Sequence, residues 1–339
     1  MLAAAYLLLV LVCGWRLRVR WLPPTRRLLG SHRVPAWAFD LPAAYVLGTI
    51  PVVSLTFFLA SATKRFAPGA DELLVANTVA VALMATALVF QTLAGRRQIA
   101  TQVPTLPHRL TRPWGRGRWP RSLFWVCALV AFGLFSWLIT FGVLTDEDGK
   151  LKSGFSVFSD YATHTALMAS FAWGDNYAPT TYPHFAGDGI QYHFFFDFFA
   201  GNLAFLGMPL DWALNVPSWL STVAFFMILG AIAIAWTGRR GAFLLAPALV
   251  MFRSGFGGFY YLIEVLPRDA QQLQVGPWEA LTRLERFVGN QEHDDWGLWT
   301  LNTFANQRHL MFALVAGLIL MSFFLPAFRA GARAPWFGR

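Results

Sequence analysis

Long apolar segments with almost no charge constrain this chain more than any other feature. Several of them reach the roughly 18 residues that an α-helix needs to cross a lipid bilayer. The composition agrees, because 56% of the 339 residues are hydrophobic and only 13% are charged. A soluble domain carries about a quarter charged residues. The sequence therefore predicts an all-α fold, namely a polytopic bundle of membrane helices.

The arginines predict how the chain is oriented, because basic residues concentrate in the cytoplasmic loops of membrane proteins. Four segments contain 18 of the 27 basic residues and none of the 18 acids: 16–33, 96–121, 239–240 and 329–339. Placing them inside the cell puts the N-terminus outside and the C-terminus inside. This topology needs seven spans, at about 2–15, 37–62, 73–94, 122–144, 216–237, 241–258 and 309–328. The same bias accounts for the net charge of +9 without a nucleic-acid partner.

One further apolar segment, Tyr192–Met208, does not fit as a span in this topology. It is short, and its residues His193, Asp197 and Gly201 recur at a spacing that puts them on one face of a helix. We expect a juxtamembrane helix that lies in the interface with this polar stripe toward water. The alternative is an eighth span with a functional polar stripe.

These spans divide the chain into three predicted parts. Residues 1–121 form an N-terminal extension of three spans with basic cytoplasmic loops, and residues 329–339 form a basic cytoplasmic tail. The part between them, 122–328, consists of a span, an external loop at 145–215, spans within 216–258, an external loop at 259–307 and a last span at 309–328.

The stretch from Ser159 to Asn202 holds four acids and three histidines beside the predicted bilayer. Ionisable residues in such a place usually serve chemistry or ligand binding. Asp160 and His164 are one helical turn apart, so we expect their side chains to point the same way. A carboxylate at Asp160 can act as a general base on an acceptor hydroxyl or bind a divalent cation, or it can cap the helix that follows.

Further candidates would bind the substrate. Arg253 and Arg308 lie at predicted outer span ends, where a guanidinium can clamp a phosphate or, alternatively, snorkel to lipid headgroups. Asp188 lies in a glycine-flanked turn, where its carboxylate either binds a ligand or bonds its own backbone. The remaining candidates are Tyr192, His193 and Asp197.

The order of these motifs resembles that of the C-type (GT-C) membrane glycosyltransferases. The resemblance covers about 145–310 and rests on SDYATHT after a span, GRRG between two spans, RSGFGGF, and NQRH at the start of a span. The group includes oligosaccharyltransferase catalytic subunits, protein mannosyltransferases and lipid A aminoarabinose transferases. The chain looks closest to bacterial members with a D-Y-x-x-H first loop.

The resemblance implies a donor and a site. The donor would be a sugar on a polyprenyl phosphate or diphosphate, and the acceptor a glycan, lipid or protein on the extracytoplasmic face of a bacterial plasma membrane. Asp160 matches the first-loop acid of the family, which is a general base or is associated with Mg²⁺ or Mn²⁺. Arg253 or Arg308 would then hold the lipid phosphate.

Two departures from the family keep other readings open. Three additional spans precede the span that leads into the first loop, where usually that one span stands alone, and fewer spans follow the loop, so a partner subunit that supplies further spans is an alternative. A second alternative is a non-catalytic subunit or transporter that binds lipid-linked sugars. A transporter should carry polar groups near mid-membrane, but Asp40 is the one acid within a predicted span, which favours chemistry at the surface.

Overall fold

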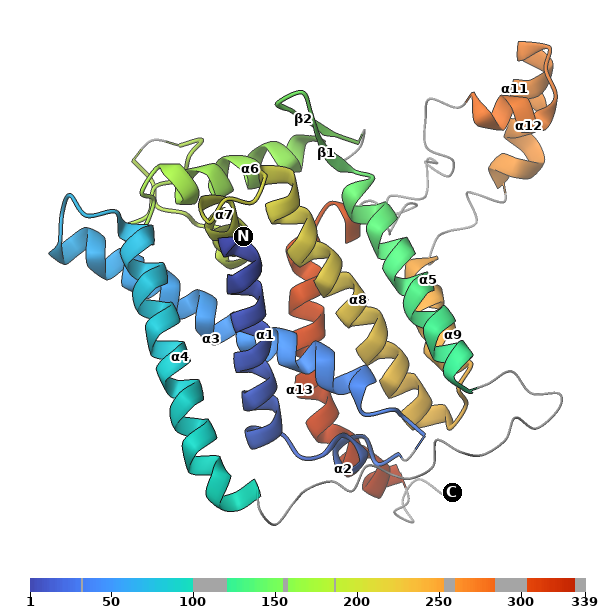
Figure 1. The fold of residues 1–339 in the computed structure, drawn as a ribbon. Coiled ribbons are helices and arrows are strands. Elements are labelled where there is room, and N and C mark those ends of the chain that lie inside the picture. The colour runs from blue at the N-terminus through green and yellow to red at the C-terminus, as the bar shows by residue number, and fades with distance from the viewer. Residues whose placement is uncertain are drawn as a thin grey trace.

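The computed structural model describes residues 1–31, 33–99, 121–154, 158–185, 187–252, 260–283 and 304–332. Within these residues the chain is almost entirely helical, and its long helices form one bundle (Figure 1). The predicted all-α, polytopic helical bundle is therefore confirmed.

Six helices in the described residues are long and apolar enough to cross a membrane. They are α1 (Leu2–Trp21), α3 (Trp37–Phe66), α4 (Glu72–Ile99), α5 (Arg121–Phe141), α8 (Leu210–Thr237) and α13 (Arg308–Ala332). The seventh predicted span, at about 241–258, contains α9 (Ala242–Met251), which has ten residues. Ten residues rise only about 15 Å, half of a bilayer's hydrocarbon core, and the residues after α9, 253–259, lie outside the described part.

Two short helices and a hairpin lie together at one end of the bundle. The hairpin of β1 (Leu144–Glu147) and β2 (Lys150–Ser153) lies there with α6 (Phe158–Trp173), α7 (Phe195–Phe205) and the N-terminus (Figure 1). Helix α2 (Thr25–Leu29) and the end of α13 lie at the opposite end. We call the end of the bundle that contains α6 the α6 end. It holds the polar stretch that the sequence singled out.

Helices α1 and α3 pack with almost no side chain between them. A Cβ atom on Gly14 would lie 1.7 Å from the carbonyl oxygen of Ala44, and one on Gly48 would lie 1.9 Å from that of Val10. Small residues allow this close approach, which lipid-embedded helices use because apolar side chains gain little by leaving lipid. The two glycines therefore set the distance between the first two spans.

The acid predicted inside a span, Asp40, is neutralised where it lies. Arg18 donates from Nε to the Asp40 carboxylate at 2.8 Å, and the hydroxyl of Thr25 donates to the same oxygen. Arg18 and Thr25 are both buried. Arg18, Thr25 and Asp40 come from three different helices, so their contacts join α1, α2 and α3 at the end opposite to α6.

Helix α8 is the centre of the bundle. It packs against α3, α5, α7, α9 and α13, and its buried face continues the same core that α1 and α3 enter. The three N-terminal helices thus share one hydrophobic core with the later ones. A smaller separate cluster is formed by α11 (Leu266–Leu273), α12 (Pro277–Thr282) and a π-helical turn at Tyr261–Val265.

Helix α7 corrects one expectation about the segment 192–208. Its 11 residues are too few to span, as the juxtamembrane interpretation requires. His193 precedes the helix and is exposed, but the part of the polar stripe within α7, Asp197 and Gly201, does not face water. Asp197 is 1% exposed, and Gly201 lies so close to α6 that a Cβ there would be 2.7 Å from the carbonyl oxygen of Met168. Asn202 exchanges side-chain hydrogen bonds with Asn77 of α4. The stripe instead joins α7 to its neighbours, because α6 covers it.

Candidate functional site

Three segments that are distant in sequence meet at the α6 end. They are the first turns of α6, the residues that lead into α7, and residues 304–309, which enter α13. The central contact joins His164 of α6 to Asp197 of α7, with His164 Nδ1 and Asp197 Oδ1 2.9 Å apart. Both side chains are buried, at 5% and 1% exposure. The structure thus pairs the predicted catalytic histidine with a predicted substrate-binding acid.

Asp160 lies beside this pair and is only partly buried. Its Oδ2 atom accepts hydrogen bonds from the side-chain amides of Asn306 and, at 3.3 Å, Gln307. Asp160 is the third residue of α6, so it is not the residue that caps the helix from outside. A carboxylate in the first turn is favoured by the helix dipole. The two amides hold the carboxylate in one orientation.

Arg308 is buried, unlike the phosphate-binding arginine that its position predicts. Its Nη1 donates to the side chain of Asn215, its Nη2 to the carbonyl oxygen of Thr140 at 2.7 Å, and its Nε to that of Ala305. The guanidinium also lies 4.7 Å from the ring centre of Tyr161. These contacts tie the start of α13 to α5, α6 and α8. The side chain is 3% exposed, and its donors are committed to these protein partners.

Two other predicted residues do not join the cluster. Asp188 is exposed, and its backbone hydrogen-bonds within a turn, accepting from Tyr182 N at 2.7 Å. These bonds use backbone atoms only, so they do not decide between the two roles of the carboxylate, and no hydrogen bond or ion pair among the described residues links Asp188 to His164 or Asp197. Arg253 lies outside the described residues, so its proposed contact with the donor stays a prediction.

Three imidazole rings surround the buried acid. The ring centres of His193 and His309 are 3.8 Å apart, and those of His164 and His309 are 5.6 Å apart. Tyr192 stacks on His193 with ring centres 3.7 Å apart. His309 was not among the predicted residues, although the NQRH motif contains it. The sequence signal that could have identified His309 is that polar residues continue from Asn306 into the first residues of the span.

Burial sets the protonation of the groups around Asp197. It raises the pKa of Asp197, an effect that the hydrogen bond and charge of His164 oppose. It also lowers the pKa of His193, against the attraction of Asp197, and raises the pKa of Tyr192 to about 12. Each shift favours the neutral form of the group, as desolvation does.

Two buried acceptor atoms at the site have no hydrogen-bond partner among the described residues. They are Oδ2 of Asp197 and Oδ1 of Asn306. Both residues line one crevice, which is too narrow for a water molecule. The other residues that line it are Tyr161, His164, Phe196, Leu214, Arg308 and His309.

The described residues contain no group of three or more His, Cys, Asp or Glu side chains arranged to hold a metal ion. Asp160 in particular has two amides as its partners rather than other ligands. The association of Asp160 with Mg²⁺ or Mn²⁺ stays a prediction from the resemblance.

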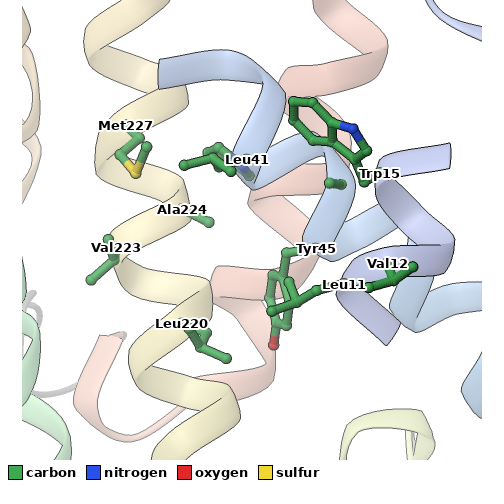
Figure 2. Close-up of a pocket in the computed structure, with 11 residues that line it drawn as sticks. Leu11, Val12, Trp15, Leu41, Tyr45, Leu220, Val223, Ala224 and Met227 are labelled. Carbon is green, nitrogen blue, oxygen red and sulfur yellow. The ribbon is translucent and has the colours of Figure 1, made fainter. Parts of the chain in front are cut away.

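An apolar groove opens between α1, α3 and α8, deeper in the bundle than the cluster (Figure 2). Its volume is about 430 Å³. Tyr45 lines it, and the ring of Tyr45 meets the ring of Phe312 of α13 edge-on, with centres 5.8 Å apart. Phe312 in turn contacts Phe196, the neighbour of Asp197. The groove and the polar cluster are thus separated by a layer of aromatic rings.

No family model, curated protein or solved structure matches this chain. The resemblance to GT-C glycosyltransferases therefore rests on the sequence motifs alone.

Proposed function

We propose that this protein is an integral membrane glycosyltransferase that uses a sugar on a polyprenyl phosphate or diphosphate as its donor. The acceptor is a hydroxyl group of a glycan, lipid or protein. One observation carries the proposal: at the α6 end, an oriented carboxylate, Asp160, lies beside the buried pair of His164 and Asp197. Two motifs of the resemblance, SDYATHT and NQRH, supply residues to that one site.

Asp160 is the general base in this proposal. Its carboxylate is partly exposed, and two amides orient it. It takes the proton of the acceptor hydroxyl as that oxygen attacks the anomeric carbon of the donor sugar. Positioned bases of this kind contribute about 10²- to 10⁴-fold to a rate.

The bundle offers a place for the lipid part of the donor. The groove in Figure 2 is lined by aliphatic and aromatic side chains, among them Leu11, Trp15, Leu41 and Met227. A chain of isoprene units comes from lipid, so it gains packing contacts in the groove rather than hydrophobic transfer energy. Its phosphate would reach the polar cluster only if the rings of Tyr45 and Phe312 turned aside.

The arginine-rich loops support an extracytoplasmic site. The segment Arg16–Arg33 covers the last turns of α1 and the residues after it, and Arg239–Arg240 follow α8, both at the end opposite to α6. Basic loops of this kind face the cytoplasm. The α6 end then faces away from the cytoplasm, where flipped lipid-linked sugars are presented, and in a bacterium the membrane is the plasma membrane.

Donor cleavage tests the proposal. The full chain in lipid nanodiscs is incubated with a panel of polyprenyl-phosphate sugars, and release of polyprenyl phosphate is measured with and without added acceptor lipids, glycans and peptides. Asp160→Asn, which keeps the shape of the side chain, should lower release by about 10²-fold or more. The matched control is Asp188→Asn in the exposed turn, which should retain full activity. Equal activity of wild type and Asp160→Asn would contradict the proposal.

A second candidate is a non-catalytic subunit that binds lipid-linked sugars, with a partner subunit that supplies further spans. The crevice at His164 and Asp197 favours it, because a crevice too narrow for a water molecule has no room for a reacting sugar. Retention of a polyprenyl-phosphate sugar by the nanodiscs, without release of polyprenyl phosphate for any donor or acceptor, would select this candidate.

A further inference from the structure

The two carboxylates of the site lie in opposite environments. Asp160 is partly exposed and accepts hydrogen bonds from two amides. Asp197 is 1% exposed, receives one contact from His164, and has an Oδ2 atom without a partner among the described residues. Amide donors favour an ionised carboxylate, whereas burial favours a protonated one. Two carboxylates in such contrasting surroundings commonly divide the roles of base and acid.

An ionised Asp197 would leave a charged oxygen buried without a donor. Unpaired buried charges are costly enough that a group usually takes up a proton instead. Water does not relieve the cost, because the crevice at Asp197 does not admit a water molecule. A proton on the His164–Asp197 pair removes the charge. The rise in the pKa of Asp197 through burial agrees with this.

The groups that face the pair do not neutralise a negative charge on it. From α13 come Arg308, whose donors reach Asn215 and two backbone carbonyls, and His309. From α6 comes Tyr161, and Asp160, one helical turn before His164, is itself an acid. From the segment before α7 come Tyr192 and His193. Burial lowers the pKa of His193, so its ring is favoured in the neutral form.

We propose that the His164–Asp197 pair holds one extra proton and is the general acid of the transfer for which Asp160 is the base. This inference rests on the proposed function. Because Nδ1 of His164 faces Asp197, Nε2 lies on the opposite edge of the ring. His164 is the catalytic residue, and Asp197 is a positioning residue that supplies and orients the proton.

The protons balance in this scheme. The acceptor oxygen forms a bond to the anomeric carbon and gives its proton to Asp160. The bond between the anomeric carbon and the phosphate oxygen breaks, and its electron pair stays on that oxygen. His164 Nε2 gives its proton to the same oxygen, while the proton of Asp197 moves to Nδ1. Asp160 ends protonated and Asp197 ionised. After the products leave, Asp160 releases its proton to solvent and the His164–Asp197 pair takes up one proton at Nε2, which restores the starting state.

The first test needs only the wild-type chain. Full-length protein labelled with ¹⁵N-histidine is placed in lipid nanodiscs, and the protonation of each imidazole nitrogen is read by NMR at about pH 7. The His164 signals are assigned with His164→Gln among the seven histidines of the chain. The expected result is a proton on Nε2 of His164. An Nε2 without a proton at that pH overturns the proposal, because the pair then has no proton to give.

The second test locates the other proton. Infrared spectroscopy at the same pH should show the carbonyl absorption of a protonated carboxylic acid in the wild type. Asp197→Asn should remove that absorption, and the matched Asp160→Asn variant should keep it. A wild-type spectrum without the absorption, or one in which it survives Asp197→Asn, contradicts the assignment. Neither test uses a substrate, so this inference can fail while the transferase proposal, read from donor cleavage, stands.

Discussion

The carboxylate of Asp160 accepts a hydrogen bond from the side chain of Asn306, a residue 146 positions further along the chain. This contact joins the first turn of α6 to the residues that enter α13, so the candidate base is positioned by a distant span. The α6 end is built from such long-range contacts, and most of its properties can be tested one side chain at a time.

Replacing the amide should weaken the base without removing it. Asn306→Leu deletes the donor to Asp160, and a hydrogen bond to a charged group contributes about 1.5–3 kcal/mol. We expect donor cleavage to fall by about 10-fold or more. Gln307→Leu is the control, because its contact with Asp160 is longer, at 3.3 Å, and should matter less. Full activity of Asn306→Leu would show that Asp160 does not need this partner.

Arg308 should be essential for folding rather than for binding the donor. Arg308→Met leaves Asn215 and two carbonyl oxygens without their donor, at about 1–3 kcal/mol for each unsatisfied group. We expect a large loss of the melting temperature in detergent, measured by fluorescence-detected size-exclusion chromatography after heating. A stable Arg308→Met protein with a raised KM for the donor would instead restore the phosphate-binding role.

The crossing of α1 and α3 should tolerate no side chain. A Cβ on Gly48 would meet backbone at 1.9 Å, and backbone cannot move aside without separating the helices. Gly48→Ala should therefore lower the melting temperature strongly. Gly317→Ala on α13 is the matched control, because a Cβ there meets nothing within 4 Å. Equal stability of the two variants would contradict the observed packing.

Asp197 should make stability depend on pH. The folded state raises the pKa of this acid, so it binds the proton more tightly than the unfolded chain does. That contribution is complete at low pH and is lost as the pH rises through the folded-state pKa of Asp197. The melting temperature of Asp197→Asn minus that of the wild type should increase as the pH rises above about 4, the pKa of an unfolded aspartate. A difference that stays constant or decreases would mean that Asp197 is ionised throughout.

The groove of Figure 2 should discriminate between donors by chain length. Val223→Trp would fill part of the groove, so it should raise the KM for long polyprenyl donors more than for short ones. Leu249→Trp on the exposed face of α9 is the control for adding a large side chain beside lipid. A uniform change for all chain lengths would place the lipid elsewhere.

The sequence by itself determined the membrane bundle and most of its spans. Apolar length is a local property, and a segment such as 37–62 has few alternatives to crossing the bilayer as a helix. The clustering of Asp160 and His164 was also readable, because residues four apart share one face of a helix. The length of the helix in the seventh predicted span was not readable from the sequence, since α9 ends at Met251 after ten residues.

Only the tertiary structure decided which side chains meet. The pairing of His164 with Asp197, and of Asp160 with Asn306, depends on how helices far apart in sequence pack, and no local pattern encodes that packing. The same reason explains the burial of Arg308 and of the α7 polar stripe. A polar residue near a span end looks the same in sequence whether water, lipid or a neighbouring helix covers it, and here neighbouring helices cover it.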